Sequence, residues 1–377
     1  MKLIHLSDLH LGKKVNGYSM IEDQKHIINE IYKIIDSEKP DGVLIAGDVY
    51  DKSVPVLDAI ELFDSFLVEL AGRGIPTFVI AGNHDSVERM SFASRLMESE
   101  GVFVSRTYSG HVDPITLEDE NGDVNIYMLP FIKPAAVKRY FEDQEIGNYT
   151  DMMKAVVGET DIDTDARNVL VSHQFVTGAV RSDSEEVSVG GIDNIDAAAF
   201  EGFDYVALGH IHGPQNMDGG RIRYCGTPLK YSMSEAGHEK SVTVVELFAK
   251  GDVSIRTIGL TPLRDMRKVE GLFADVIEAG RGEGEACSDY VHVVLKDEDE
   301  VAGAYDQLRK IYPNIMGMNY DNTRTRNTEA VGLAQEVDKK SELELFAELF
   351  TKQNGRDMSP EQEEYMTALI NDLKGAK

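Results

Sequence analysis

The stretch IHLSDLHLGK, residues 4–13, joins an apolar run to two polar side chains that follow it. Residues 2–7 look like a β-strand, and Asp8 and His10 come directly after it. Residues two apart on an extended segment point the same way, so the Asp8 carboxylate and the His10 imidazole can face one site. This stretch therefore predicts a strand that brings two donor side chains to its carboxyl end.

Apolar runs alternate with helical patterns through the first half of the chain. We expect strands at residues 2–7, 42–46 and 76–81, and helices at residues 21–35, 59–70 and 88–99. This β-α-β-α-β-α order is typical of an α/β domain with buried strands. Later strands without long helices between them are expected at residues 126–130, 168–172, 205–208, 222–225 and 241–247. The mixture predicts an α/β fold in which two sheets pack as a sandwich flanked by helices.

Polar motifs follow five of the expected strands. They are Asp8-Leu9-His10, Gly47-Asp48, Gly82-Asn83-His84-Asp85, Ser172-His173 and Gly209-His210-Ile211-His212. Taken singly, such a residue is more often a cap, a turn residue or a satisfied core histidine than a ligand. Taken together they contain five of the 10 histidines of the chain, and ligands of α/β sheets collect beyond the carboxyl ends of the strands. The motifs therefore predict one shared site.

The donor types in these motifs indicate divalent metal ions. Asp, Asn and His donors without cysteine suit manganese, iron or zinc better than a thiolate-binding metal. Seven candidate ligands are too many for one open catalytic ion and suit two ions bridged by one carboxylate. Two ions roughly 3.5–4 Å apart can hold the attacking and leaving oxygens of a displacement at phosphorus. The sequence therefore predicts a two-metal site for phosphoester hydrolysis.

The series of motifs resembles the calcineurin-like metallophosphoesterase superfamily. Within it, longer stretches are similar to the nuclease subunits of bacterial complexes that process DNA double-strand breaks. These stretches are IHLSDLHLGK (4–13), LIAGDVYD (44–51), AGNHDS (81–86), FDYVALGHIHGPQ (203–215) and CGTPLKYSMSEA (225–236). The resemblance covers the chain to about Glu246 through specific motifs, and beyond that it depends on the order of domains alone.

The resemblance implies a role for each motif residue. One ion would be held by Asp8, His10 and His212, the other by Asn83, His173 and His210, with Asp48 bridging the two and Mn²⁺ the expected metal. His84 would donate a proton to the leaving oxygen, and Asp85 would orient His84. Archaeal and eukaryotic relatives carry a second histidine three residues after the bridging aspartate. This chain has Asp51 there, and its role stays open.

The chain is expected to contain four parts. They are a nuclease domain at residues 1–260, a small α/β capping domain that contacts DNA at 261–322, a charged linker at 323–340, and a helix pair at 341–377. The second helix of the pair should begin with Ser359 as its cap, Pro360 in its first turn, and Gln362 completing a capping box. The resemblance implies that this pair docks on the coiled coil of a partner ATPase. The alternative is that the helices pack on their own domain.

A homodimer is a further expectation from the resemblance. The contact would be formed near residues 55–70 and 89–100, with an apolar seam of Phe63, Phe66, Phe92, Leu96 and Met97. The alternative for each of these side chains is ordinary packing on the sheet.

The charge of the chain sets a limit on DNA binding. Its 377 residues carry a formal net charge of −28, which argues against a free-standing nucleic-acid binder. We therefore expect weak DNA binding by the isolated subunit, with the ATPase partner supplying most of the affinity. Lys13, Lys14 and Arg89 could form a local basic rim near the site.

The expected function is a metal-dependent DNA nuclease that works with an ATPase partner. It would be an ATP-dependent 3′→5′ exonuclease on duplex ends and an endonuclease on single strands and hairpins, in DNA repair, recombination and replication. One alternative is a phosphatase or phosphodiesterase on a substrate other than DNA, and another is a non-enzymatic scaffold. Two cysteines, Cys225 and Cys287, give no disulfide framework, so we expect the protein in a reducing cytoplasm. A DNA substrate would place it at the nucleoid.

Overall fold

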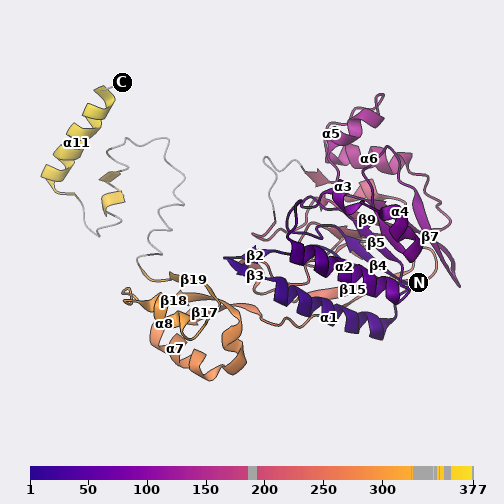
Figure 1. Ribbon diagram of the computed structural model, residues 1–377. Helices are drawn as coiled ribbons and strands as arrows, with labels where there is room; N and C mark the ends of the chain where they lie inside the picture. The colour runs from indigo at the N-terminus through magenta and orange to yellow at the C-terminus, as the bar shows by residue number, and fades with distance from the viewer. Residues whose placement is uncertain are drawn as a thin grey trace. The chain divides into compact units, whose positions relative to one another are not determined.

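The computed structural model describes residues 1–185, 193–323 and 358–375, with positions 325, 343, 346, 347 and 349–351 between the last two ranges. The chain forms two compact units, Met1–Met266 and Arg267–Lys377, and each is described by itself (Figure 1). Among the described helices, none combines the length and the apolar character that crossing a bilayer requires.

The first sheet of the larger unit has six strands in the order β16-β15-β1-β4-β5-β6. The strands are β1 (Lys2–Leu6), β4 (Gly42–Ala46), β5 (Thr77–Ile80), β6 (Val102–Val104), β15 (Ser241–Leu247) and β16 (Val253–Gly259). β1, β4, β5 and β6 run parallel, and β15 pairs antiparallel with β1. The carboxyl ends of the four parallel strands therefore lie at one edge.

The second sheet also has six strands, in the order β13-β14-β12-β9-β8-β7. The strands are β7 (Pro114–Asp119), β8 (Gly122–Leu129), β9 (Arg167–His173), β12 (Tyr205–Gly209), β13 (Gln215–Met217) and β14 (Ile222–Tyr224). The four central strands are parallel to one another, and the two outer strands are antiparallel to their neighbours.

The two sheets pack face to face around a shared apolar core. Leu44 and Phe78 from the first sheet meet Val169 and Ala207 from the second, and all four side chains are fully buried. Helices α1 (Ile21–Glu38) and α2 (Leu57–Gly72) lie over the first sheet, and α6 (Tyr149–Glu159) packs on the outer face of the second (Figure 1). The predicted two-sheet sandwich flanked by helices is confirmed.

Short elements complete the larger unit. They are β2 (Lys14–Val15), β3 (Tyr18–Ser19), α5 (Pro134–Val137), η2 (Lys138–Tyr140), β10 (Phe175–Val176), β11 (Asn194–Ile195), η3 (Ala197–Phe200), η4 (Asp218–Gly220) and η5 (Met233–Glu235). Most of them lie in loops between the strands.

The third expected helix differs from the prediction. Residues 88–99 form α3 (Val87–Met90), α4 (Ser94–Met97) and the start of η1 (Glu98–Glu100) in place of one helix. Ala93 has a φ of 60°, in the left-handed region, which a right-handed helix cannot contain. The interruption leaves Phe92 82% exposed, so the apolar periodicity of this segment does not describe a core-facing helix.

The smaller unit is built on a three-stranded sheet. Its order is β17 (Met266–Gly271), β18 (Tyr290–Leu295), β19 (Ile315–Tyr320), with β18 and β19 parallel. Helices α7 (Phe273–Gly282) and α8 (Ala304–Arg309), with the short η6 (Gly284–Ser288), accompany the sheet around a core that includes Val293, Leu308 and Tyr312.

The last described helix is α11 (Pro360–Gly375). The backbone N–H of Ser359 donates to Oε1 of Gln362 at 2.9 Å, and the backbone N–H of Gln362 faces Oγ of Ser359 at 3.3 Å. This reciprocal pair confirms the predicted capping box. The expected linker at 323–340 and most of the first helix of the expected pair lie outside the described residues.

Candidate metal centre

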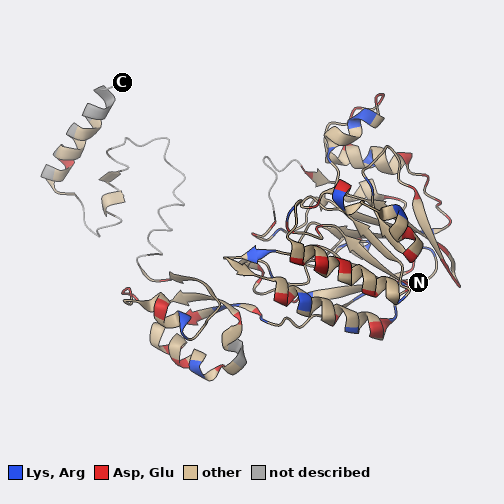
Figure 2. Cartoon of the chain, viewed as in Figure 1, with Lys and Arg blue, Asp and Glu red and all other residues tan. Residues whose placement is uncertain are grey.

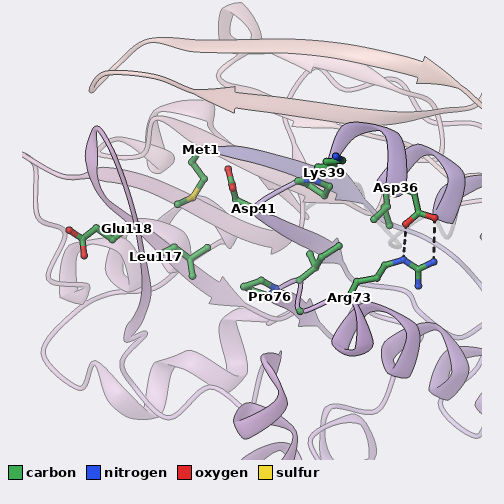
Figure 3. Close-up of a pocket in the computed structure, with 12 residues that line it drawn as sticks. Met1, Asp36, Lys39, Asp41, Arg73, Pro76, Leu117 and Glu118 are labelled. Carbon is green, nitrogen blue, oxygen red and sulfur yellow. Dashed lines mark hydrogen bonds and ion pairs between the residues drawn. The ribbon is translucent and has the colours of Figure 1, made fainter.

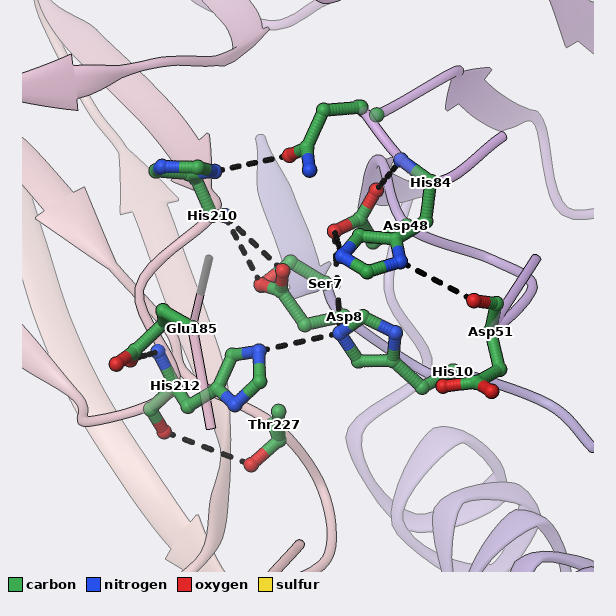
Figure 4. Close-up of polar contacts among 12 residues, drawn as sticks. Ser7, Asp8, His10, Asp48, Asp51, His84, Glu185, His210, His212 and Thr227 are labelled. Atoms are coloured by element: carbon green, nitrogen blue, oxygen red, sulfur yellow. Dashed lines mark hydrogen bonds and ion pairs between the residues drawn. The ribbon is translucent and has the colours of Figure 1, made fainter. Parts of the chain in front are cut away.

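The predicted donor side chains meet where parallel strands of both sheets end. β1, β4 and β5 lead into Asp8 and His10, Asp48, and Asn83, while β9 and β12 lead into His173, His210 and His212. Asn83 is half-buried and the other six residues are buried. Figure 4 shows Asp8, His10, Asp48, His210 and His212 converging from the two sheets. The contacts of Asn83 with His173 and His210 bring the remaining two donors to the same place.

One group of donors contains Asp8, His10 and His212. Nε2 of His10 lies 3.1 Å from Nε2 of His212. Each of the three residues offers a ligand atom, and these atoms lie within 4.8 Å of one another. The Asp8 carboxylate also accepts the backbone N–H of His210 at 3.0 Å, which ties this group to the neighbouring strand end.

A second group contains Asn83, His173 and His210. Oδ1 of Asn83 lies 3.1 Å from Nε2 of His173 and 3.0 Å from Nδ1 of His210. Oδ2 of Asp48 lies between the two groups, 3.3 Å from Nε2 of His173 and 3.8 Å from Nε2 of His10. Oδ1 of Asp8 also lies 4.0 Å from Nε2 of His173, so both carboxylates approach the second group and Asp48 is the nearer of the two.

Hydrogen bonds behind two of the histidines fix which nitrogen faces the site. Nδ1 of His173 lies 2.8 Å from the carbonyl oxygen of Ala46, which can only accept, so this nitrogen carries the hydrogen. Nδ1 of His212 lies 2.6 Å from Oγ of Ser184. Nε2 of both rings is therefore left to face the other donors.

The backbone at the site is held in costly conformations. Asp8, His10, Asp48 and His210 have φ values of 51°, 43°, 48° and 96°, although none is glycine. Such conformations cost about 1–3 kcal/mol each and persist where the surrounding structure enforces them. Gly82 is required next to them, because a Cβ at this position would collide with Oδ1 of Asp48.

The pKa values of Asp8, Asp48 and His173 are all shifted by burial and by the charges of their neighbours. Burial raises the pKa of Asp8 to about 6, against the attraction of His173 and His212. Burial also opposes ionisation of Asp48, but the attraction of His173 outweighs it and lowers the pKa of Asp48 well below its usual range. Burial would lower the pKa of His173, yet the charges of Asp48 and Asp8 raise it to about 9.

The pKa values of Asp48 and His173 are compatible with metal binding at this site. A proton on His173 neutralises Asp48 in the metal-free protein, and ligand atoms give up such protons when a metal binds. Buried carboxylate, amide and imidazole donors grouped on either side of Asp48 suit divalent cations. The site therefore has donors for two divalent metal ions.

His84 lies at the edge of this centre, and its contacts differ from the expectation. Nδ1 of its ring faces the backbone carbonyl of Asp51 at 3.1 Å, and Nε2 lies 3.9 Å from Oδ2 of Asp48. In the described part of the chain the Asp85 carboxylate accepts from the backbone N–H groups of Gly82, Val49 and Tyr50, not from the His84 ring. Asp85 thus holds the loop that carries His84, and the direct orienting contact comes from Asp51.

The Asp51 side chain has a separate contact. Its Oδ1 pairs with Nζ of Lys13 at 2.8 Å. Lys13 is therefore part of an ion pair at the rim, while Lys14 is exposed and Arg89 donates to the carbonyl oxygen of Ser53 at 2.7 Å. The three predicted rim cations thus have three different surroundings.

A rim of two aromatic rings and two cations was missed by the sequence analysis. The rings of Phe131 and Phe175 both lie 6.4 Å from the His210 ring, measured between centroids. The Arg181 guanidinium lies 3.8 Å from the centre of the Phe175 ring, and Nζ of Lys133 lies 5.7 Å from that of Phe131. The only sequence signal was the run Phe131-Ile132-Lys133, which begins two residues after the end of β8.

Donor groups of this kind at the carboxyl edge of a two-sheet sandwich suit a metal-dependent phosphoesterase. Comparison with known proteins agrees with this class. Residues 1–214 match the family model of calcineurin-like phosphoesterases, and residues 262–354 match that of the type 5 capsule protein repressor C-terminal domain.

Curated relatives extend over the whole chain. The D subunit of nuclease SbcCD from Staphylococcus epidermidis is 30% identical over 100% of both chains. Its counterpart from Staphylococcus saprophyticus subsp. saprophyticus is 31% identical over 99% of both chains. A solved dimetal phosphatase from Danio rerio is 10% identical and covers 69% of this chain and 96% of its own, with a TM-score of 0.38.

The chain belongs to the calcineurin-like phosphoesterase family and, within it, to the SbcD family of nuclease SbcCD. It is a metal-dependent phosphodiesterase. This assignment depends on the family models and the full-length relatives, not on the distant solved structure.

Proposed function

We propose that this chain is the nuclease subunit of an SbcCD-type complex and hydrolyses phosphodiester bonds in DNA with two Mn²⁺ ions. The observation that carries the proposal is the position of Asp48, 3.3 Å from His173 and 3.8 Å from His10. One carboxylate between two groups of donors is the arrangement that a two-ion phosphoryl-transfer site needs. The proposed ligands are Asp8, His10 and His212 for one ion, Asn83, His173 and His210 for the other, and Asp48 for both.

The ions and the protein would divide the work of catalysis. When bound, the two ions supply Lewis-acid stabilisation of the charge that develops at phosphorus. His84 gives a proton to the leaving oxygen. Its Nδ1 is held by the Asp51 carbonyl, its Nε2 points toward Asp48, and its side chain is 18% exposed, so a substrate can reach it. General acid catalysis of this kind contributes about 10²–10⁴-fold in rate.

The aromatic and cationic rim supports DNA as the substrate. Phe131 and Phe175 lie beside His210, and stacking of one base on an aromatic side chain is worth about 1–3 kcal/mol. Lys133 brings positive charge near Phe131 in a chain of net charge −28, whereas Arg181 lies over Phe175 and is paired with Asp193 at 2.7 Å. A nucleic acid strand presents both bases and a charged backbone to these residues. A DNA substrate implies work in the cytoplasm at the nucleoid.

The partner is proposed to be an SbcC-type ATPase. Tyr365 and Leu369 of α11 are 70% and 42% exposed, so this helix has apolar side chains available for a coiled coil. The four expected parts of the chain are retained in this proposal, with residues 261–322 as the domain that contacts DNA.

The proposed homodimer uses a smaller seam than expected from the sequence. Phe63 and Phe66 are 5% and 0% exposed, so they pack in the core of their own protomer. Phe92 and Leu96 are 82% and 75% exposed beside Ile60 at 42%. Met97 and Phe92 line a groove of about 390 Å³ on this face. These side chains are the ones proposed to meet a second copy.

The test is degradation of linear duplex DNA by the purified full-length chain with Mn²⁺. We expect 3′→5′ degradation, its loss in excess EDTA, and a fall of about 10²–10⁴-fold in His84→Gln. His111→Gln is the matched control, because this exposed histidine lies away from the site and should keep full activity. Full activity of His84→Gln would remove His84 from its role.

A second assay separates the proposed nuclease from a phosphatase. Bis-p-nitrophenyl phosphate is a diester and p-nitrophenyl phosphate is a monoester. We expect the diester and DNA to be hydrolysed, and ATP to stimulate DNA cleavage when the ATPase is co-purified. Hydrolysis of the monoester without any activity on DNA would contradict the proposal.

A further inference from the structure

A buried network of side chains lies behind His212, one residue of the first donor group. Nδ1 of His212 lies 2.6 Å from Oγ of Ser184, and this oxygen lies 2.5 Å from Oε1 of Glu235. Glu235 ends η5 and is 0% exposed. Ser184 and Glu235 are separated by 51 positions and belong to none of the five strand-end motifs.

The same network also holds the backbone of His212. Nζ of Lys240 lies 2.5 Å from Oε2 of Glu235 and donates to the His212 carbonyl oxygen at 3.0 Å. The backbone N–H of His212 donates to Oε1 of Glu185 at 2.6 Å. The ring nitrogen, the N–H and the carbonyl of one residue are thus each held by buried or half-buried side chains.

The chemistry of these groups gives the hydrogen bonds a direction. A carboxylate only accepts, so the Ser184 hydroxyl donates to Glu235 and accepts from Nδ1 of His212. The hydrogen of the His212 ring is then on Nδ1, and Nε2 presents its lone pair. That nitrogen lies 3.1 Å from Nε2 of His10, inside the donor group.

The other histidines of the site are held differently. The His173 ring is anchored by the backbone carbonyl of Ala46. Nδ1 of His10 has no hydrogen-bond partner among the described residues. His212 is therefore the ring whose orientation depends on replaceable side chains, and this makes the network testable.

We propose that Ser184 and Glu235 are positioning residues that fix the His212 ring for metal binding, with Lys240 holding Glu235 in place. This inference rests on the proposed metal-dependent function. Partners behind a metal-binding histidine set its tautomer and orientation, and their loss typically lowers metal affinity about 10–100-fold. A network with a purely structural role would affect folding alone.

The experiment is a calorimetric titration of metal-free protein with Mn²⁺, next to thermal unfolding of the same samples. We expect Ser184→Ala to weaken one of two binding events about 10–100-fold. Ser184→Thr keeps the hydroxyl and should bind nearly as the unchanged protein does. Ser65→Ala is the matched control, because Ser65 is an exposed residue of α2 whose hydroxyl donates to the carbonyl oxygen of Glu61 at 2.8 Å.

A second variant tests the far end of the network. Glu235→Gln alone would leave Lys240 buried without its partner, so it is combined with Lys240→Met. The double variant should weaken the same binding event as Ser184→Ala does. If it does not fold, the comparison of Ser184→Ala with Ser184→Thr decides.

The outcomes separate this inference from the proposed function. Two Mn²⁺ ions bound with unchanged affinity by folded Ser184→Ala would overturn the positioning role alone. A lower melting temperature with unchanged Mn²⁺ affinity would do the same and assign the network to folding. Failure of the unchanged protein to bind Mn²⁺ would overturn the proposed metal-dependent function together with the inference.

Discussion

The two edges of the first sheet carry charged residues in opposite settings. At the carboxyl edge, Asp8 and Asp48 are buried, have left-handed backbone conformations and lie among imidazoles. At the amino edge, a groove of about 600 Å³ is lined by residues that include Asp36, Asp41 and Arg73 (Figure 3). Arg73 pairs there with Asp36 at 2.9 Å, and the Asp36 side chain is 59% exposed.

The comparison shows that charge alone does not mark a site. Exposed ion pairs are screened by water and contribute little, so the amino edge can be a solvated surface. Buried carboxylates with costly backbone conformations need a compensating reason, and a bound cation supplies one. Replacing matched residues at the two edges should therefore have very different effects.

The largest effect is expected from Asp48→Asn at the carboxyl edge. This change removes the charge that lies between the two donor groups, so the rate of DNA degradation at saturating Mn²⁺ should fall by at least about 10²–10³-fold. Asp41→Asn at the amino edge is the matched control, since Asp41 accepts only an exposed backbone contact from Lys2 at 2.7 Å. Equal rates for the two variants would break the comparison.

A smaller effect is expected from the rim of the same edge. Phe175→Ala should raise the KM for single-stranded DNA about 10-fold, because stacking on its ring is lost. Cleavage of an abasic single strand should stay unchanged, since that substrate keeps the phosphodiester backbone but has no base to stack. Phe175→Leu serves as the control for apolar volume without an aromatic face. Equal losses on both substrates would instead indicate damage to His210.

A third position, His5 in the middle of the same sheet, shows what burial does to an ionisable side chain. Burial first, and then the charge of Arg223, lower the pKa of this histidine to about 3, so it stays neutral in the folded protein. The unfolded chain takes up a proton near pH 6.5, so stability is present above that pH and is lost as the pH falls toward 3.

His5→Gln should remove this part of the acid sensitivity. Between pH 6.5 and 3.5 the free energy of unfolding of the unchanged protein should fall faster than that of the variant, by at most about 1.4 kcal/mol per pH unit. Urea unfolding at several pH values measures the difference. Parallel curves for the two proteins would show that His5 does not titrate in this way.

The smallest effect is expected at the amino edge. Arg73→Ala removes the exposed pairs with Asp36 and Glu69 and should change neither the urea midpoint nor the rate on DNA beyond measurement error. A clear loss of activity in this variant would mean that the groove at the amino edge has a role of its own.

Much of the candidate site can be predicted from the polar residues that follow the expected strands. Parallel strands align their carboxyl ends, so polar residues directly after apolar runs converge whatever their separation in the chain. Asp8, His10, Asp48, Asn83, His173, His210 and His212 therefore lie together, and their roles as ligands remain a proposal. Ile211 is buried in the apolar core of the second sheet, although β12 ends at Gly209 and the left-handed backbone of His210 breaks the strand alternation there.

Other features could not be read from the sequence. The contact that holds His84 comes from the backbone carbonyl of Asp51, and every residue type offers such a carbonyl. Ser184 and Glu235 reach His212 from separate loops and follow no apolar run. The positive φ of Ala93 interrupts the helix that the apolar periodicity of residues 88–99 predicts.

The sequence by itself determined the two-sheet sandwich and the set of donor residues, because apolar periodicity and strand-end chemistry are local properties that the chain states directly. Only the tertiary structure decided which nitrogen of the His173 and His212 rings faces inward, and which groups stand behind these two rings. Those properties depend on distances of a few ångströms between segments far apart in the chain, and no local pattern contains them.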